Sequence, residues 1–294
     1  MDIPITYLER IRAMRPDLSI KSARQMPEAG DNDVIVIDGP SGACVFRFAK
    51  TEERRRRMVD EMRLLALIRD RTILPVPNPI MYEADVMVYP RIEGEPLTAW
   101  LIASLNDATQ QRLADQLGTF LRALHSTPKS AEMPMPSPGQ YRAYVERRLT
   151  EVRGKLYPHL MAFQREWVER LFGDALCDPT FFEHEPVLIH NDFKVDHILF
   201  DAKSQRINGV IDFGWACYGD PSIDICNLLQ WYGESFVSRM AGAYPEMRLM
   251  MPRARFSALG GEVDWLMDGL EPGGQHWFFA NLATNRDIRF PIIA

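Results

Sequence analysis

The chain has 294 residues, 46% of them hydrophobic, which is enough for a sizeable core in two domains or in one domain with two lobes. Its formal net charge of -6 argues against a general nucleic-acid partner and mildly favours a cationic ligand. No apolar run approaches the roughly 18 residues of a membrane span, and the N-terminal stretch mixes acids and arginines, so we predict a cytoplasmic protein without a membrane partner. The four cysteines show no metal-ligand spacing, which predicts free thiols.

The part of the chain before about residue 90 is rich in β-like patterns. Two apolar runs, Val34–Ile37 and Cys44–Phe48, flank the turn residues 38–42, which indicates a hairpin. A helix is expected after Thr51, because this residue can cap it and apolar residues then recur every three to four positions, at Met58, Met62, Leu65 and Ile68. A further short strand is expected at Val86–Tyr89.

The remainder of the chain is predicted to be mostly helical. One helix is expected over 109–126, with Leu113, Leu117, Phe120, Leu121 and Leu124 on one face, and the proline-rich stretch 127–139 is expected to be an exposed loop. Further helical stretches are expected over 140–172 and from Ile223 onward, with three short β-like runs between them. The sequence therefore predicts an α+β, two-lobed fold with a mostly β lobe at 1–90, a hinge at 91–96 and a helical lobe at 97–294.

Two aspartates between His190 and Asp224 stand in distinctive settings. Asp192 follows a short apolar run that ends in His190, and Asp212 is followed by Phe213 and Gly214. This pattern is typical of kinases, in which the first aspartate is the general base, a residue five positions later binds metal, and the aspartate of the DFG motif binds metal again. The fifth position here is His197. We therefore predict phosphoryl transfer with Asp192 as base and with His197 and Asp212 holding Mg²⁺, or alternatively Mn²⁺.

A cation for the phosphates of the nucleotide is expected at the end of the predicted strand CVFRFAK. Lys50 closes this strand, and Glu61 on the following helix is placed to fix its side chain, with Glu53 as an alternative partner. The basic run Glu52–Arg57 is interpreted as a solvated helix face with i, i+4 ion pairs rather than as a nucleic-acid patch. His190 is interpreted as a hydrogen-bonded brace for the loop that it begins.

The segments HNDFKVDHILFD and INGVIDFG resemble the aminoglycoside phosphotransferases, in particular the 2''-phosphotransferase branch, in which a histidine at the position of His197 is usual. GDNDV, FRFAK and RIEGEPL resemble the same branch. The resemblance implies a protein-kinase-like fold, ATP or GTP as phosphate donor, and a nucleotide base held at the hinge by Pro90 and Ile92. It also implies the roles given above for Lys50, Glu61, Asp192, His197 and Asp212, and it implies that Asp220 braces the catalytic loop, residues 190–197.

The acceptor that the resemblance favours is a polycationic aminoglycoside. Its ammonium groups require acids, and the candidates follow Asp220: Asp224, Glu234, Glu262, Asp264 and Asp268, with Trp231 beside them. Trp215 directly after IDFG departs from the family, which leaves the acceptor open.

The alternatives are a kinase for a macrolide, choline or an amino alcohol, or a nucleotide-binding pseudokinase. The presence of Lys50, Asp192, His197 and Asp212 argues against the pseudokinase. Protein partners and the choice between ATP and GTP stay open.

Overall fold

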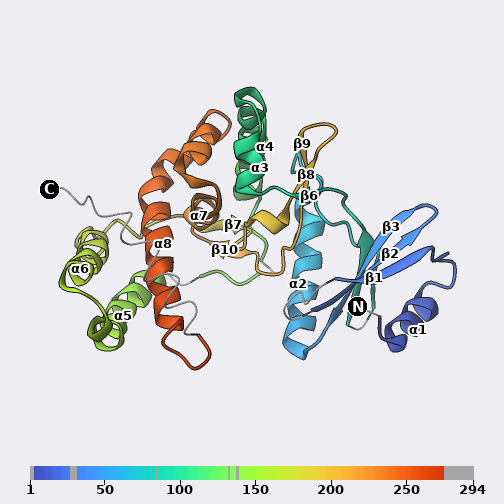
Figure 1. Ribbon diagram of the computed structural model, residues 1–294, viewed down its shortest axis with the longest axis horizontal. Helices are drawn as coiled ribbons and strands as arrows, with labels where there is room; N and C mark the ends of the chain where they lie inside the picture. The colour runs from blue at the N-terminus through green and yellow to red at the C-terminus, as the bar shows by residue number, and fades with distance from the viewer. Residues whose placement is uncertain (1–2, 27–31, 84, 132, 137–138, 275–294) are drawn as a thin grey trace.

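The computed structural model describes residues 3–26, 32–83, 85–131, 133–136 and 139–274. The N-terminal part contains α1 (Ile5–Met14), β1 (Ser22–Gln25), β2 (Asn32–Gly39), β3 (Gly42–Ala49), α2 (Glu52–Ile68), β4 (Met81–Glu83) and β5 (Val86–Pro90). Its five strands form one antiparallel sheet in the order β1-β2-β3-β5-β4. The sheet and α1 lie at one end of the molecule, and α2 lies between them and the helical part (Figure 1).

The two faces of this sheet pack against different helices. Phe46 and Phe48 of β3 belong to the apolar cluster that includes Ile11 of α1, whereas Val45 belongs to the cluster with Met58 of α2. Successive side chains of a strand point to opposite faces, so odd-numbered residues of β3 face α2. The expected hairpin is confirmed, and Gly42 in its turn has a φ of 116°, which favours glycine.

The remaining elements are mostly helical. They are β6 (Glu95–Pro96), α3 (Ala99–Ser104), α4 (Asp107–His125), α5 (Gln140–Lys155), η1 (Tyr157–His159), α6 (Ala162–Cys177), β7 (Val187–Ile189), η2 (Val195–His197), β8 (Ile198–Asp201), β9 (Arg206–Val210), β10 (Cys217–Gly219), α7 (Ser222–Ser238), η3 (Arg239–Gly242) and α8 (Met247–Asp268). β6, β8 and β9 form one small antiparallel sheet, and β7 pairs with β10. α5 and α6 lie at the far end of the molecule from the large sheet (Figure 1).

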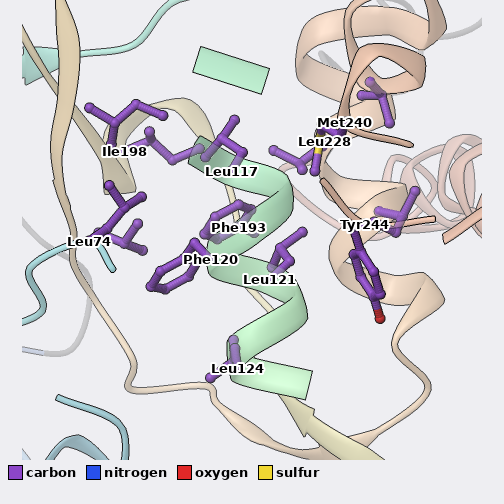
Figure 2. Packing of buried hydrophobic residues seen from close by; sticks show 14 of the residues in the cluster. Leu74, Leu117, Phe120, Leu121, Leu124, Phe193, Ile198, Leu228, Met240 and Tyr244 are labelled. Atoms are coloured by element: carbon purple, nitrogen blue, oxygen red, sulfur yellow. The ribbon is translucent and has the colours of Figure 1, made fainter. Parts of the chain in front are cut away.

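The main core surrounds α4. The five apolar residues predicted for one face of this helix are fully buried, which confirms the prediction. Phe120 stacks on Phe193 of the catalytic loop with ring centroids 5.9 Å apart, and Met240 and Tyr244 pack on the other side of the helix (Figure 2). The same cluster includes Leu64 and Leu65 of α2, so the core of the helical part extends to the helix that packs on the large sheet. Burial of each such side chain contributes about 1.5–3 kcal/mol to stability. α4 supports the loop that follows β7, because Phe120 of α4 stacks on Phe193 of that loop.

Some elements differ from the expectation. The helix expected over 140–172 is divided into α5 and α6, because Pro158 lacks an N–H and ends the helical ladder there. α1, α3, β1, β4, β6 and β10 were not predicted. The four cysteines are free, as predicted. Among the described residues, no helix combines the length and apolar character that crossing a membrane requires. The predicted helical stretch beyond residue 274 lies outside the described residues.

Candidate active site

Asp192, His197 and Asp212 converge at one point, as the motif predicted. One ligand atom from each lies within 4.8 Å of the other two. The Nδ1 atom of His197 lies 2.8 Å from the carbonyl oxygen of Asp192, and because a carbonyl can only accept, Nδ1 carries the proton. This leaves Nε2, which lies 3.3 Å from Oδ2 of Asp212, as the atom that can bind a cation. One imidazole nitrogen and two carboxylates form a donor set that Mg²⁺ or Mn²⁺ can use.

The backbone next to both aspartates is unusual. Asn191 and Asp212 have φ values of 64° and 63°, in the left-handed region that only a few per cent of non-glycine residues adopt. His190 connects the two segments, since its Nε2–H donates to the carbonyl oxygen of Ile211 at 3.0 Å and its Nδ1 accepts from the N–H of Asp192 at 3.3 Å. The ring is fully buried, and this burial lowers the pKa of His190 below its ordinary value. His190 therefore acts as a neutral brace, in agreement with its interpretation from the sequence.

The partner of Glu61 is Arg47, and the prediction that Glu61 fixes Lys50 is wrong. Nη1 of Arg47 lies 2.7 Å from Oε1 of Glu61, and Nη2 lies 3.9 Å from Oδ1 of Asp212. Lys50 is exposed, and its Nζ lies 3.3 Å from Asp33. Strand alternation explains the difference. Arg47 lies two residues after Val45 and points to the same face of the sheet, toward α2, whereas Lys50 lies two residues after Phe48, which points to the opposite face. The alternative partner Glu53 pairs with Arg57 instead.

Charges around Asp212 keep its carboxylate ionised. Burial alone would raise the pKa of Asp212, but the charge of Arg47 opposes this most strongly and holds the pKa below its ordinary value. Burial likewise opposes the charge of Arg47, and the carboxylate of Glu61 outweighs it and raises the pKa of Arg47. Oδ2 of Asp192 lies 3.1 Å from Nζ of Lys194. The site thus places a cationic side chain beside each of the two aspartates, Lys194 beside Asp192 and Arg47 beside Asp212.

These residues line a cleft with a volume of about 810 Å³. Apolar side chains of the large sheet line the cleft, namely Val34, Val36 and Val45. Leu199 of β8 and Ile211, which follows β9, also line it. Ile92 lines the cleft as predicted for a hinge residue, whereas Pro90 is exposed, pairs with Cys44 in the sheet and is not among the lining residues. Such a slot suits a planar base, with the polyphosphate directed toward Arg47 and Asp212.

Trp215, the departure noted in the sequence, lies at the mouth of this cleft. The guanidinium carbons of Arg54 and Arg57 lie 4.8 and 4.1 Å from its ring centroid. Arg54, Arg57 and Glu61 occur at helical spacing along α2, and all three line the cleft. The predicted i, i+4 pairs Glu52–Arg56 and Glu53–Arg57 are present, but this face of the helix also borders the site. The spacing from Glu61 was the signal in the sequence that could have identified the two arginines.

The acids predicted for acceptor binding do not line this cleft. Asp224 is fully buried, and its carboxylate accepts from the backbone N–H groups of His190 and Asn191 at 2.9 and 2.8 Å. Asp224 therefore braces the catalytic loop, the role that had been predicted for Asp220, and it is not available to an acceptor. The carboxylate of Asp220 instead pairs with Arg253 at 2.7 Å and caps the N–H of Ser222. Both acids lie at the start of α7, one turn apart.

The other predicted acceptor residues are on α7 and α8. Glu234 forms an exposed ion pair with Arg255, and this pairing lowers the pKa of Glu234. Asp264 pairs with Arg148 of α5 at 2.5 Å, although burial is the largest influence on Asp264 and raises its pKa. Trp231 is 45% exposed. Glu262 is buried, and neither it nor Asp268 lines the cleft.

Comparison with known proteins identifies the family of the chain. Residues 22–256 match the model of the phosphotransferase enzyme family (APH). The chain belongs to this family. The viomycin phosphotransferase of Streptomyces vinaceus is 26% identical over 219 residues, covering 70% of this chain and 72% of that protein. Acyl-CoA dehydrogenase family member 11 of Homo sapiens is 24% identical over 171 residues, which are 54% of this chain but only 21% of that protein. The chain thus spans about a fifth of the first curated relatives that it matches.

Solved structures of phosphotransferases share the fold over nearly the whole chain. The GDP and kanamycin complex of APH(2'')-IIIa is 25% identical, covers 95% of this chain and 96% of that chain, and has a TM-score of 0.80. A macrolide 2'-phosphotransferase of type I, 22% identical, has a TM-score of 0.71 over 96% of this chain and shows likeness of fold alone. The predicted kinase-like α+β fold and the predicted membership of the phosphotransferase family are confirmed.

Proposed function

We propose that this phosphotransferase moves the γ-phosphate of ATP or GTP to a hydroxyl group of a small molecule, with Asp192 as the general base. The observation that carries the proposal is the convergence of Asp192, His197 and Asp212 in the cleft, beside the buried Arg47–Glu61 pair. Nucleotide complexes of similar proteins, with GDP and with ATP, support a nucleoside triphosphate as donor. The lobes at 1–90 and 97–294 with a hinge at 91–96 stay a prediction, as does a cytoplasmic location.

In the proposed reaction the carboxylate of Asp192 orients the acceptor hydroxyl and takes its proton. The acceptor oxygen forms a bond to the γ-phosphorus, and the bond from this phosphorus to the bridging oxygen of the diphosphate breaks. Nε2 of His197 and the carboxylate of Asp212 would hold Mg²⁺ or Mn²⁺, which neutralises charge on the phosphates when bound. Arg47 takes the phosphate-binding role that the sequence had assigned to Lys50, because Arg47 lines the cleft and Glu61 holds its guanidinium in place.

The proposed acceptor is a polycationic aminoglycoside. Similar solved structures contain kanamycin, gentamicin and streptomycin, and these supply the chemical class to test first. Glu234 and Trp231 are exposed on α7, and the ion pair of Glu234 with Arg255 is half-exposed on both sides, so an ammonium group can replace the arginine at little cost. We propose that no nucleic acid or membrane takes part.

A phosphorylation screen tests the proposal. The purified chain is incubated with γ-labelled ATP or GTP, with Mg²⁺ or Mn²⁺, and with aminoglycosides, a neutral macrolide and choline in separate reactions. Transfer to an aminoglycoside supports the full proposal. Transfer to the macrolide or to choline alone would reject the aminoglycoside and retain the kinase, and absence of transfer to every compound together with absence of nucleotide hydrolysis would reject the proposed reaction.

A further inference from the structure

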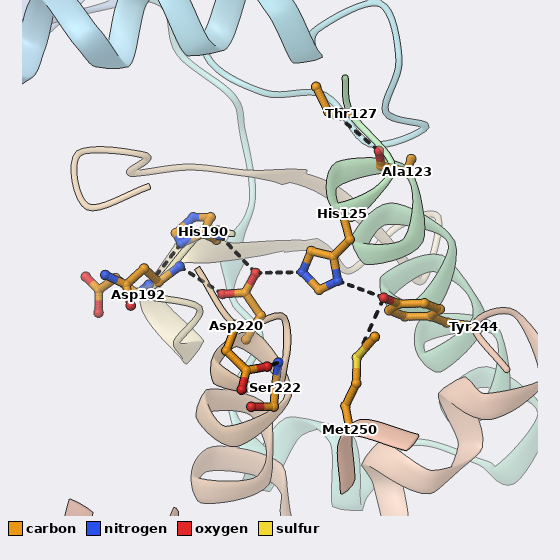
Figure 3. Close-up of polar contacts among 11 residues, drawn as sticks. Ala123, His125, Thr127, His190, Asp192, Asp220, Ser222, Tyr244 and Met250 are labelled. Carbon is orange, nitrogen blue, oxygen red and sulfur yellow. Dashed lines mark hydrogen bonds and ion pairs between the residues drawn. The ribbon is translucent and has the colours of Figure 1, made fainter. Parts of the chain in front are cut away.

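His125 is a buried residue at the end of α4, distant in sequence from every motif. Its Nε2 atom lies 3.1 Å from Oδ2 of Asp224, and its Nδ1 atom lies 2.9 Å from the hydroxyl oxygen of Tyr244. Figure 3 shows the ring between His190 on one side and Tyr244 on the other. The end of α4, the catalytic loop and the start of α7 are far apart in the sequence and meet at the carboxylate of Asp224.

The packing of α4 brings Tyr244 to this position. Gly118 lies two turns before His125, and a Cβ atom added there would be 2.9 Å from the carbonyl oxygen of Met240. Only glycine allows this close approach of α4 and η3, so the backbone that leads to Tyr244 is held against the helix. The ring centroids of His125 and Tyr244 lie 5.6 Å apart in an edge-to-face arrangement.

The hydrogen-bonding groups fix the proton of His125. An ionised carboxylate only accepts, so Nε2 of His125 must donate to Asp224. Tyr244 can donate to Nδ1, or it can accept from Nδ1–H while it donates to Sδ of Met250 at 3.7 Å. In both arrangements the N–H on Nε2 is directed at Asp224, because the carboxylate can only accept, and the hydroxyl of Tyr244 holds the opposite side of the ring in place.

We propose that His125 and Tyr244 are positioning residues for phosphoryl transfer. They orient the carboxylate of Asp224, which binds the N–H groups of His190 and Asn191 and thereby sets the direction of Asp192. The effect on turnover rests on the proposed role of Asp192 as the base. A displacement of the base by about 1 Å can lower turnover by roughly 100-fold, so a distant residue in this chain of contacts can control the rate.

The test uses Tyr244→Phe and His125→Gln, with Tyr141→Phe as a matched control. Tyr141 also makes one hydrogen bond through its hydroxyl, to Ser257 at 3.2 Å, but belongs to the separate core cluster of α5, α6 and α8. Two measurements are made: hydrolysis of Mg·ATP and Mg·GTP with water as acceptor, and hydrogen exchange of the backbone amides of His190 and Asn191. The exchange measurement is independent of activity, so it judges the bracing even where the proposed reaction fails.

The expected result is a fall in kcat of roughly 3- to 10-fold for Tyr244→Phe and of roughly 10- to 100-fold for His125→Gln, with the KM for the nucleotide within about twofold. Exchange of the two amides should accelerate in both variants and not in Tyr141→Phe. In an Asp224→Asn background, Tyr244→Phe should have no further effect on kcat, because the link to the loop is already broken.

Three outcomes would overturn the proposal. These are unchanged exchange of the two amides in both variants, equal acceleration in the Tyr141→Phe control, or a full additive loss of kcat from Tyr244→Phe in the Asp224→Asn background. If His125→Gln does not fold, Tyr244→Phe alone still tests the proposal, because it removes only the hydroxyl oxygen that contacts His125.

Discussion

The carboxylates that support the catalytic residues and the exposed carboxylate of Glu234 on α7 are held in different ways. Asp224 is fully buried and accepts three hydrogen bonds, and Glu61 is buried against one guanidinium. Glu234 is half-exposed and has a single arginine partner. A buried charge must keep its partner, whereas an exposed ion pair exchanges partners at little cost. The reaction therefore depends on a fixed network. The proposed acceptor wall, Trp231 and Glu234 of α7, can exchange its ion-pair partner without loss of the fold.

The largest expected effect is on the Arg47–Glu61 pair. Arg47→Met would leave the carboxylate of Glu61 buried without its cation, so we expect a loss of about 3–5 kcal/mol in the free energy of unfolding and loss of nucleotide binding. Lys50→Met should change stability by less than about 0.5 kcal/mol, because Lys50 is exposed. Urea unfolding and nucleotide titration check both variants. A larger effect at Lys50 than at Arg47 would restore the assignment from the sequence.

Asp224→Asn should lower kcat by roughly 10- to 100-fold while nucleotide affinity is retained.

The same substitution should also change how the stability of the protein depends on pH. Burial would raise the pKa of Asp224, but the hydrogen bond and charge of His125 hold it below its ordinary value. A lowered folded-state pKa contributes stability above the unfolded value of about 3.9 that is lost as pH falls through the folded value. Stability of the wild type should therefore decline below about pH 4 more steeply than that of Asp224→Asn. Parallel acid-unfolding curves would contradict this account.

The metal site is expected to tolerate one substitution. His197→Asn should retain activity within severalfold with Mg²⁺, because asparagine supplies the oxygen that Mg²⁺ prefers to nitrogen. Mn²⁺ should support the wild type comparatively well, since imidazole suits it better. His197→Ala serves as control, and the measurement is turnover over a range of each metal. Equal metal dependence of the wild type and His197→Ala would remove His197 from the site.

The smallest effect is expected on the acceptor wall. Glu234→Gln should raise the KM for an aminoglycoside by roughly two- to fivefold, with unchanged stability and nucleotide KM, because an exposed pair contributes at most about 1 kcal/mol. Arg255→Gln should lower the same KM, since it removes the cation that competes with the acceptor. High salt should weaken both effects. If Arg255→Gln raises the KM instead, Glu234 does not contact the acceptor.

The sequence predicted the residues that lie close together along the chain better than those that only the fold brings together. Asp192, His197 and Asp212 belong to one motif whose spacing is fixed by short strands. Arg47 was missed because both faces of β3 are buried, so the apolar pattern does not reveal which residues face the cleft.

Tertiary packing determined the remaining assignments. Asp220 and Asp224 lie one turn apart at the start of α7, and only the packing of this helix beside α4 decides which carboxylate reaches the catalytic loop. His125 has no signal in the sequence beyond its place at the end of an apolar helix face. The acceptor acids were proposed from the charge of a ligand, and the partners of Glu234 and Asp264 on other helices were not visible.

The most direct test of the central claim compares Asp192→Asn with Asp196→Asn in single-turnover transfer from γ-labelled nucleotide. Both residues line the cleft, and both substitutions remove one negative charge there. Asp192→Asn is expected to lower the rate of transfer by roughly 10²- to 10⁴-fold with nucleotide affinity retained, the usual contribution of a positioned general base, while Asp196→Asn stays within severalfold of the wild type. A fall of less than about tenfold for Asp192→Asn, or an equal fall for Asp196→Asn, would show that Asp192 is not the base.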